Sequence, residues 1–247
     1  MTSTNLDQTP PAEAPPRARS RWHAVRRLWR AEAVYAAGLA AFAVLAVFAR
    51  LYAYFGWDLT AARSLQSSSI PGLFGLMSAA SVFGNGLTPW VLTTLTAIAF
   101  FAFGRRSETA GLILSAGGGE LVNRIIKAII GRPRPLSDLV RVSVYPATES
   151  FPSGHVTFYV CYFGFLFFVA YALLPRGSTA RRAALVLSAL PVLLVGLSRV
   201  YLGAHWPSDT LGAYLFSGLW LAFSIDMYRR WKQRATFHPE AQIQKQE

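Results

Sequence analysis

Long apolar stretches dominate the chain and alternate with short segments that carry most of its charges. A helix needs about 20 predominantly apolar residues to cross the hydrocarbon core of a bilayer. The pattern therefore predicts an all-α fold, an integral membrane bundle of six transmembrane helices. The six predicted spans are 32–55, 87–104, 109–130, 154–174, 182–202 and 207–228.

A shorter apolar stretch, from Ile70 to Phe83, contains several Gly and Ser residues. Its length suits an interfacial helix or a re-entrant segment better than a seventh crossing, which is the alternative. The chain then divides into a disordered basic N-terminal tail over 1–31, a transmembrane domain over 32–230 and a cytoplasmic C-terminal tail over 231–247. A cleavable signal peptide is the other interpretation of the N-terminus, but the first span is long for its apolar region.

Composition agrees with a membrane protein, since 53% of the residues are hydrophobic and only 15% are charged. The net charge of +12 would also suit a nucleic-acid-binding protein. The Lys and Arg residues, however, gather at the ends of the predicted spans, so no nucleic-acid partner is expected. The single cysteine, Cys161, cannot form an intramolecular disulfide, and no spacing of Cys and His predicts a metal site.

The distribution of Lys and Arg predicts the orientation of the spans. Basic clusters precede the first span and follow the second, fourth and sixth, so they share one side of the membrane if all six spans exist. The positive-inside rule makes that side cytoplasmic. Both termini are therefore expected in the cytoplasm.

Three ionisable residues interrupt the third predicted span: Glu120, Arg124 and Lys127. Their spacing places them on one helical face, where Glu120 and Arg124 suit a mutually neutralising structural pair. Lys127 lies in the last turn, where its side chain would also reach the lipid headgroups by snorkelling. Ionisable groups are costly in a bilayer, so these residues are candidates for function as well.

The segment that follows Lys127 reads Ala-Ile-Ile-Gly-Arg-Pro-Arg134-Pro135 and is stiffened by two prolines. A guanidinium held on such a turn is well suited to bind phosphate oxygens, and Arg132 is a further candidate. A basic anchor for headgroups is the alternative interpretation.

A second polar segment, Pro152-Ser153-Gly154-His155, stands at the start of the fourth span. Ser153 is a favoured N-cap residue, and the free amides at a helix N-terminus bind anions. His155 adds a group that exchanges a proton near neutral pH. Plain helix capping is the alternative.

A third segment joins the fifth and sixth spans and contains Arg199, His205 and Asp209. His205 and Asp209 are one helical turn apart, so the carboxylate can accept a proton from one ring nitrogen and leave the other unprotonated. A nucleophilic histidine requires that state, whereas a structural His–Asp cap is the alternative. In the predicted topology all three segments share the non-cytoplasmic face, which indicates a phosphoryl-transfer site.

The three segments together resemble the signature of the type 2 phosphatidic acid phosphatase superfamily, which also includes vanadium-dependent haloperoxidases. The matching residues are Lys127-(six residues)-Arg134-Pro135, Pro152-Ser-Gly-His155 and Ser198-Arg199-(five residues)-His205-(three residues)-Asp209. The resemblance covers about 109–228 and extends to 32–104 only in hydropathy.

The resemblance implies a role for each motif residue. His205 would attack phosphorus to give a phosphohistidine, Asp209 would orient it, and His155 would protonate the leaving group and then activate water. Neither a metal nor another cofactor is implied. The phosphoryl oxygens would be bound by Lys127, Arg134, Ser153, Gly154 and Arg199.

The implied function is that of a multi-pass phosphatase of the cell (inner) membrane, acting on a lipid phosphate whose headgroup enters from the periplasmic or extracellular side. Undecaprenyl diphosphate, phosphatidylglycerol phosphate and phosphatidic acid are all candidate substrates, and the oligomeric state stays open. Arg132 and Arg141 are candidates for binding a second phosphate, and Asp138, Arg141 and Glu149 for tuning access. The alternatives are a non-catalytic lipid-binding, transport or scaffold relative and, less favoured, a vanadium-dependent haloperoxidase.

Overall fold

The structure is a computed structural model that describes residues 17–145 and 147–237. Its contacts divide the chain into two units, Met1–Ala37 and Gly38–Glu247. The helix α1 (Arg17–Leu51) spans their boundary. It begins within the predicted disordered tail over 1–31, whose last part is helical because Arg, Ala and Leu favour a helix. The other tail residues, 1–16 and 238–247, lie outside the described part.

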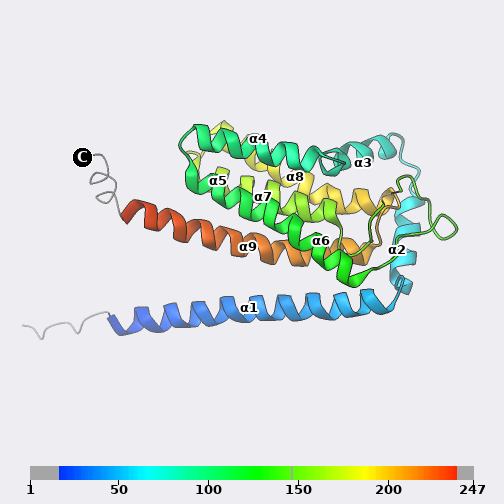
Figure 1. Ribbon diagram of the computed structural model, residues 1–247, viewed down its shortest axis with the longest axis horizontal. Coiled ribbons are helices and arrows are strands. Elements are labelled where there is room, and N and C mark those ends of the chain that lie inside the picture. Colours follow the sequence, from blue (N-terminus) through cyan, green and yellow to red (C-terminus); the bar gives the residue numbers. More distant parts are fainter. Residues whose placement is uncertain (1–16, 146, 238–247) are drawn as a thin grey trace, which may run out of the picture. The chain divides into compact units, whose positions relative to one another are not determined.

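The second unit contains the other elements and all the segments with candidate chemistry (Figure 1). In the described residues every regular element is helical, which confirms the predicted all-α class. Its elements are α2 (Gly56–Gln66), α3 (Leu73–Ser81), the 3₁₀ turn η1 (Val82–Gly84), α4 (Thr88–Ala102), α5 (Arg106–Leu112), the π-helical stretch η2 (Ile113–Gly118), α6 (Gly119–Ile130), α7 (Gly154–Leu173), α8 (Thr179–Tyr201) and α9 (Pro207–Phe237).

Four helices in the described residues are long and apolar enough to cross a membrane. A fifth arises if Leu73–Gly84 and Thr88–Ala102, which meet at a bend of 56°, form one broken span. The predicted span 109–130 corresponds to α5, η2 and α6, which follow one another without a loop. The count of six spans and the side of the termini remain predictions. The four helices are Glu32–Leu51, Gly154–Leu173, Thr179–Tyr201 and Pro207–Arg234.

A π-helical stretch interrupts the segment that leads into α6. Trp220 Nε1 from α9 donates to the carbonyls of Leu114 and Ser115 at 3.0 and 3.2 Å, so the widened turn is held by a side chain of another helix. A Cβ on Gly119 would come within 2.7 Å of Cys161 Sγ, so glycine there lets α6 lie close to α7. The same contacts fix the helix that carries Lys127.

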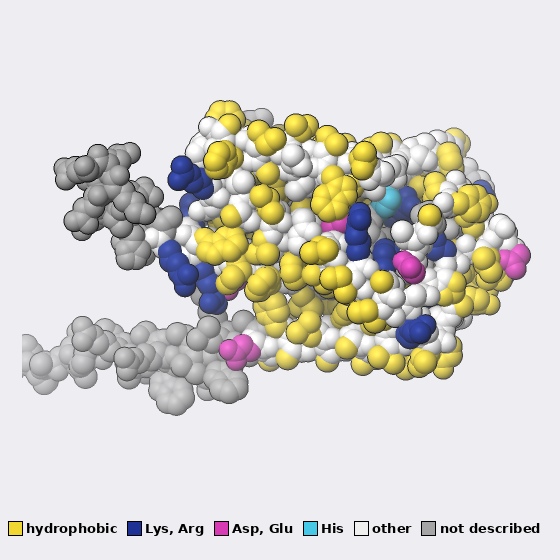
Figure 2. All heavy atoms as spheres, viewed as in Figure 1, with side chains coloured by type: hydrophobic (Ala, Val, Ile, Leu, Met, Phe, Trp, Pro, Cys, Tyr) yellow, Lys and Arg dark blue, Asp and Glu magenta, His cyan; other side chains and the backbone are white. Residues whose placement is uncertain are grey.

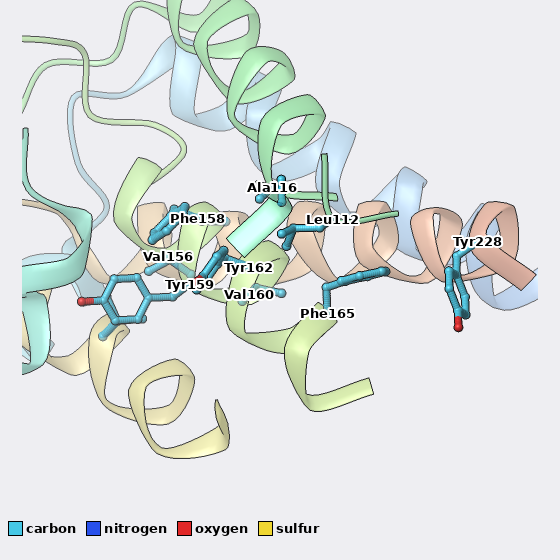
Figure 3. Packing of buried hydrophobic residues seen from close by; sticks show 12 residues of the cluster. Leu112, Ala116, Val156, Phe158, Tyr159, Val160, Tyr162, Phe165 and Tyr228 are labelled. Atoms are coloured by element: carbon cyan, nitrogen blue, oxygen red, sulfur yellow. The ribbon is translucent and has the colours of Figure 1, made fainter. Parts of the chain in front are cut away.

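The apolar core surrounds α7, which contacts both α8 and α9. Figure 3 shows its side chains packed with Leu112, Ala116 and Tyr228 from the neighbouring elements. A helix that is apolar on all sides is expected in the interior of a bundle. Its buried position fixes the N-terminus of α7, where His155 lies.

The two ends of the second unit contain different connecting segments, and Lys and Arg side chains lie toward both of them (Figure 2). The α4–α5 connection and the C-terminal end of α9 lie at one end, and α2 and the loop after α6 lie at the other (Figure 1). One cluster of Lys and Arg side chains lies at the first end (Figure 2). The three candidate segments therefore lie at the end opposite to that basic cluster.

Candidate active site

A cavity of about 450 Å³ opens between the start of α4, one face of α6 and the N-terminus of α7. Six of the eight residues predicted for the site line it, whereas Ser153 and Asp209 are buried and do not. Figure 2 shows a histidine side chain on this face, with Lys and Arg side chains beside it. The six lining residues are Lys127, Arg134, Gly154, His155, Arg199 and His205.

His205 lies in the short connection between α8 and α9, where its side chain is almost fully buried. Gly203 permits this connection, because its φ of 68° is left-handed and a Cβ there would collide with the Arg141 carbonyl. His205 Nε2 lies 3.1 Å from Arg134 Nη1. A guanidinium can only donate, so Nε2 accepts this bond and the neutral ring carries its proton on Nδ1.

The His205 ring stays neutral at physiological pH. Burial lowers the pKa of His205 well below its ordinary value of 6.5, and the positive charges of Arg134, Lys127 and Arg199 lower it further. The unprotonated Nε2 is therefore available to an electrophile in the cavity.

Asp209 lies behind His205, in the first turn of α9. Its Oδ2 atom is 3.5 Å from His205 Nδ1 and accepts hydrogen bonds from the Trp206 amide at 2.8 Å and from Ser150 Oγ at 2.5 Å. Ser150 Oγ is itself 3.5 Å from His205 Nδ1. The carboxylate thus caps the start of α9 and also faces the imidazole. A structural cap and a partner for a nucleophilic histidine are therefore compatible roles for Asp209. The sequence analysis missed Ser150, whose only signal was its place two residues before Pro152.

Arg132 does not face the cavity, which corrects its prediction as a phosphate ligand. Its side chain is fully buried, and the guanidinium donates to Asp209 Oδ1 at 2.6 Å and to Asp58 Oδ2 at 3.0 Å. Ser208 completes the cluster, donating to Asp58 from its amide at 2.8 Å and from its hydroxyl at 2.7 Å. Two buried carboxylates therefore hold the arginine that the sequence shows only as a cation in a turn. Asp58, from α2, was not predicted.

Arg141 also does not line the cavity, which corrects its prediction as a second-phosphate ligand. Its Nη2 donates to the Gln66 carbonyl at 2.8 Å, and its backbone amide donates to Gln66 Oε1 at 2.9 Å. Asp138 likewise does not line the cavity. Neither of these two residues of the loop after α6 therefore lines the space that a ligand would occupy.

The carbonyls of Thr148, Glu149 and Ser150 hold two of the predicted cations. Lys127 Nζ donates to the carbonyls of Glu149 and, at 3.3 Å, of Ser150. Arg134 donates to the Thr148 carbonyl at 2.5 Å and to the Glu149 carbonyl at 3.1 Å. Lys127 is buried by these contacts, which argues against simple snorkelling. Glu149 thus acts on the site through its backbone.

Two buried donors in this region have no partner in the described part of the chain: Arg199 Nε and Ser153 Oγ. Arg199 Nη1 donates to Ser81 Oγ at 2.5 Å, which fixes the guanidinium. Ser153 stands at the N-cap of α7, but its hydroxyl makes no capping hydrogen bond. Buried donors without partners are costly, and Arg199 lines the cavity, so an anionic ligand there would be a natural partner for its Nε.

His155 lies in the first turn of α7, and its Nε2 is 2.9 Å from Asn85 Oδ1. Gly84 presses against the ring, since a Cβ there would lie 2.3 Å from His155 Cδ2. The sequence analysis missed both neighbours, because the segment between α3 and α4 carries no charged residue. His155 is thus positioned by the segment between α3 and α4.

The remaining charges of the cavity come from α6. Arg124 Nε donates to Glu120 Oε1 at 3.1 Å, which is the predicted pair. Both residues line the cavity, and the Arg124 guanidinium lies 5.3 Å from the centroid of the Trp90 ring.

The arrangement suits a tetrahedral oxyanion. Lys127, Arg134 and Arg199 surround it with positive charge, and the free amides at the N-terminus of α7 add donors. Imidazoles from two segments line the same cavity. In the described ranges no group of three His, Cys, Asp or Glu side chains is placed to hold a metal ion.

Known proteins resemble this chain in sequence. Residues 108–233 match the model of the PAP2 superfamily. Phosphatidylglycerophosphatase B of Bacillus subtilis (strain 168) is 31% identical over 155 residues, or 60% of this chain and 74% of that protein. Undecaprenyl-diphosphatase of Sulfolobus acidocaldarius is 24% identical over 190 residues, or 74% of this chain and 84% of that protein.

A solved structure agrees in fold. The crystal structure of a transmembrane PAP2 type phosphatidylglycerolphosphate phosphatase from Bacillus subtilis aligns with a TM-score of 0.66 at 23% identity, covering 79% of this chain and 96% of that one. The family match itself takes in about half of the chain, and within it lie all three segments that line the cavity. On this match, the chain belongs to the PAP2 superfamily.

Proposed function

We propose that the protein is an integral membrane phosphatase that hydrolyses a phosphate monoester or diphosphate lipid through a phosphohistidine on His205. The observation that carries the proposal is the position of His205 Nε2. This unprotonated nitrogen lies 3.1 Å from Arg134 in a cavity shared with Lys127, Arg199 and His155. Relatives that act on phosphatidylglycerophosphate and undecaprenyl diphosphate, by their names, support lipid phosphates as the substrate class.

In the first step of the proposed reaction, Lys127, Arg134 and Arg199 hold the phosphoryl oxygens with the Ser153 hydroxyl and the Gly154 amide. His205 Nε2 forms a bond to phosphorus while the bond from phosphorus to the leaving oxygen breaks. His155, protonated at the start of this step, gives its proton to that oxygen and becomes neutral, so the lipid leaves as an alcohol or as a lipid monophosphate. Three side-chain cations supply the charge that a metal ion supplies in many phosphoryl transferases, so the reaction is proposed to be metal-independent.

In the second step, His155 takes a proton from water and the resulting hydroxide attacks phosphorus. The bond from phosphorus to Nε2 breaks, inorganic phosphate leaves and neutral His205 is restored. Asp209 faces the Nδ1 proton throughout, which keeps Nε2 directed at phosphorus and stabilises the positive ring of the intermediate.

The proposed topology places the cavity at the outer face of the cell (inner) membrane, toward the periplasm or the extracellular side. Six helical segments would cross the membrane in this topology. Four are the helices that are long and apolar enough by themselves, and the other two are α4 and the continuous α5–η2–α6 segment. The support for this topology is the cluster of Lys and Arg side chains at the end of the second unit opposite to the cavity (Figure 2). Both termini would then be cytoplasmic.

Phosphate release from purified protein tests the function. Undecaprenyl diphosphate, phosphatidylglycerol phosphate and phosphatidic acid are presented separately in detergent micelles with EDTA, and kcat/KM is compared. Release from at least one of them in the presence of EDTA is expected. Folded protein that binds these lipids and releases no phosphate from any of them would exclude a phosphatase.

Gly84→Ala is expected to lower kcat about tenfold or more, because the new methyl group must displace the His155 ring from its contact with Asn85. Gly75→Ala is the matched control, since nothing lies within 4 Å of its added Cβ. Phosphate release is measured for both at the same substrate concentrations. Equal activity of the two variants would show that the position of His155 does not matter.

The His205 ring should remain neutral below pH 6.5, because burial and the neighbouring cations disfavour its charged form. Histidine-labelled protein in detergent micelles is titrated by NMR from pH 7.5 to pH 5 in buffer without phosphate. The chain has four histidines, so a His205→Asn sample assigns the signal. A midpoint at or above 6.5 would contradict the expected neutral nucleophile.

A further inference from the structure

The cavity is lined by one more cation than the three assigned above to the reacting phosphate. Among the described residues, Lys127, Arg134, Arg199 and Arg124 are the Lys and Arg side chains that line it. The first three surround the two histidines and are assigned above to the reacting phosphate. Arg124 is the fourth, and its side chain is 60% exposed where the other three are more deeply placed.

Arg124 lies on α6 at some distance from the phosphate that His205 is proposed to attack. It precedes Lys127 by three residues on α6, so it shares a face with Lys127 and lies about 4.5 Å further along the axis, away from the loop that follows α6. In the proposed topology this direction leads toward the middle of the bilayer. A ligand group bound there would stand between the reacting phosphorus and the hydrocarbon.

The contacts of Arg124 orient its guanidinium without using up its donors. Nε donates to Glu120 Oε1, and the guanidinium lies against the Trp90 ring. In the described part of the chain, nothing accepts a hydrogen bond from its two Nη nitrogens. The planar guanidinium of Arg124 is held by an aromatic ring and one carboxylate. Its remaining N–H groups can donate to two oxygens of one phosphate.

Trp90 lies where the polar cavity meets an apolar groove. It lines the polar cavity and, in addition, an apolar groove of about 460 Å³ that runs along α4 beside α5 and η2. A substrate whose phosphate lies at His205 and whose chain occupies this groove must pass Trp90. The chemical group that links its phosphorus to its chain would therefore lie beside Arg124. The apolar lining of the groove includes Ala97, Ile98, Phe101 and Ile113.

We propose that Arg124 binds a second phosphate of the substrate, on the hydrocarbon side of the phosphate that His205 attacks. This inference rests on the proposed phosphatase function and narrows its substrate class to lipids with two phosphates. A lipid diphosphate has its second phosphate directly beside the first, and a phospholipid with a terminal phosphomonoester has it one glycerol away. Phosphatidic acid has none, so it makes no use of Arg124. Glu120 balances the charge of Arg124 in the empty site and is released in part when the second phosphate binds.

Arg124→Gln tests the proposal, because it removes the charge and keeps a side chain of similar polarity. The expected loss in kcat/KM is about 10- to 100-fold for undecaprenyl diphosphate or phosphatidylglycerol phosphate, whichever is the substrate, which is the size of a charge-assisted hydrogen-bond pair. The kcat/KM for phosphatidic acid with the same acyl chains should change by less than about twofold. Arg124→Lys, which keeps the charge and loses the fork, should lie between Arg124→Gln and the unmodified protein.

The matched control is Arg230→Gln on α9. Arg230 forms the same kind of i,i+4 pair, with Asp226 at 2.8 Å, but does not line the cavity. It should leave all three substrates unaffected. An Arg124→Gln variant that loses activity equally on every substrate, or on none, would reduce Glu120–Arg124 to a structural pair and overturn the proposal.

A binding measurement separates this inference from the proposed function. In the non-hydrolysing His205→Ala background, inorganic diphosphate should raise the Tm more than inorganic phosphate does, and Arg124→Gln should remove that difference. If the protein hydrolyses no lipid phosphate, the proposed function fails while this measurement still decides whether Arg124 binds a second phosphate. Equal stabilisation by the two anions, with or without Arg124, would count against the subsite.

Discussion

Phosphate release from lipid phosphates should cease when His205 is replaced by alanine, with a loss on the order of 10⁴-fold or more. The substitution removes the atom proposed to bond to phosphorus, which among the described residues is the imidazole nitrogen in contact with Arg134. The alternative route, direct attack by water, lacks the covalent intermediate that divides the reaction into two easier steps. Release of inorganic phosphate is measured under saturating substrate.

Folding is checked separately for this variant, by size-exclusion chromatography and circular dichroism in detergent. His205 packs in a connection rather than in the apolar core around α7, so a folded protein is expected. A rapid acid-free quench of the unmodified protein with ³²P-labelled substrate should trap a label that acid removes and base does not. Appreciable turnover by folded His205→Ala would assign the nucleophile to another residue.

Asp58→Asn should lower kcat about 100-fold and also destabilise the protein, although Asp58 does not line the cavity. The carboxylate accepts from Arg132 Nη2 and from the amide and hydroxyl of Ser208. A neutral amide leaves the buried charge of Arg132 with one carboxylate in place of two, and breaking a buried pair costs about 3–5 kcal/mol. Arg132 then no longer holds Asp209 in place behind His205.

A split between kinetic constants distinguishes this positioning role from general destabilisation. Asp58→Asn should change kcat much more than KM, because the phosphate-binding cations do not contact Asp58. Asp226→Asn is the matched control, since Asp226 pairs with Arg230 on the exposed side of α9. Thermal unfolding and kcat are measured below the Tm of each variant. A fall in Tm with unchanged kcat would make Asp58 purely structural.

The helices that sequence predicts best are those whose limits depend on local signals. The predicted spans 154–174 and 182–202 match α7 and α8 to within three residues, because a continuous apolar run fills each helix. The region of α5, η2 and α6 was predicted as one uniform span. Its π-helical stretch depends on hydrogen bonds from Trp220, about 100 residues later, which no local pattern shows.

The candidate site divides in the same way. Sequence motifs indicate the residues whose types are costly or unusual in a membrane, and six of these eight line one cavity. Asp58, Asn85 and Ser150 were missed, because each acts through a partner from a distant segment. Arg132 was assigned the wrong partner for a related reason. The sequence shows that the proline-containing turn carries an arginine. The direction of the Arg132 side chain, however, depends on two carboxylates that only the fold brings together.

The ion pair between Arg132 and Asp58 joins the part of the chain that matches the family to a helix outside that match, since α2 precedes residue 108. A chimera that exchanges residues 108–233 with a relative would therefore inherit an arginine whose acidic partner stays behind. Such hybrids should regain activity only when the carboxylate of α2 is transplanted together with the arginine. In a chimera, Asp58 and Arg132 should therefore be exchanged together.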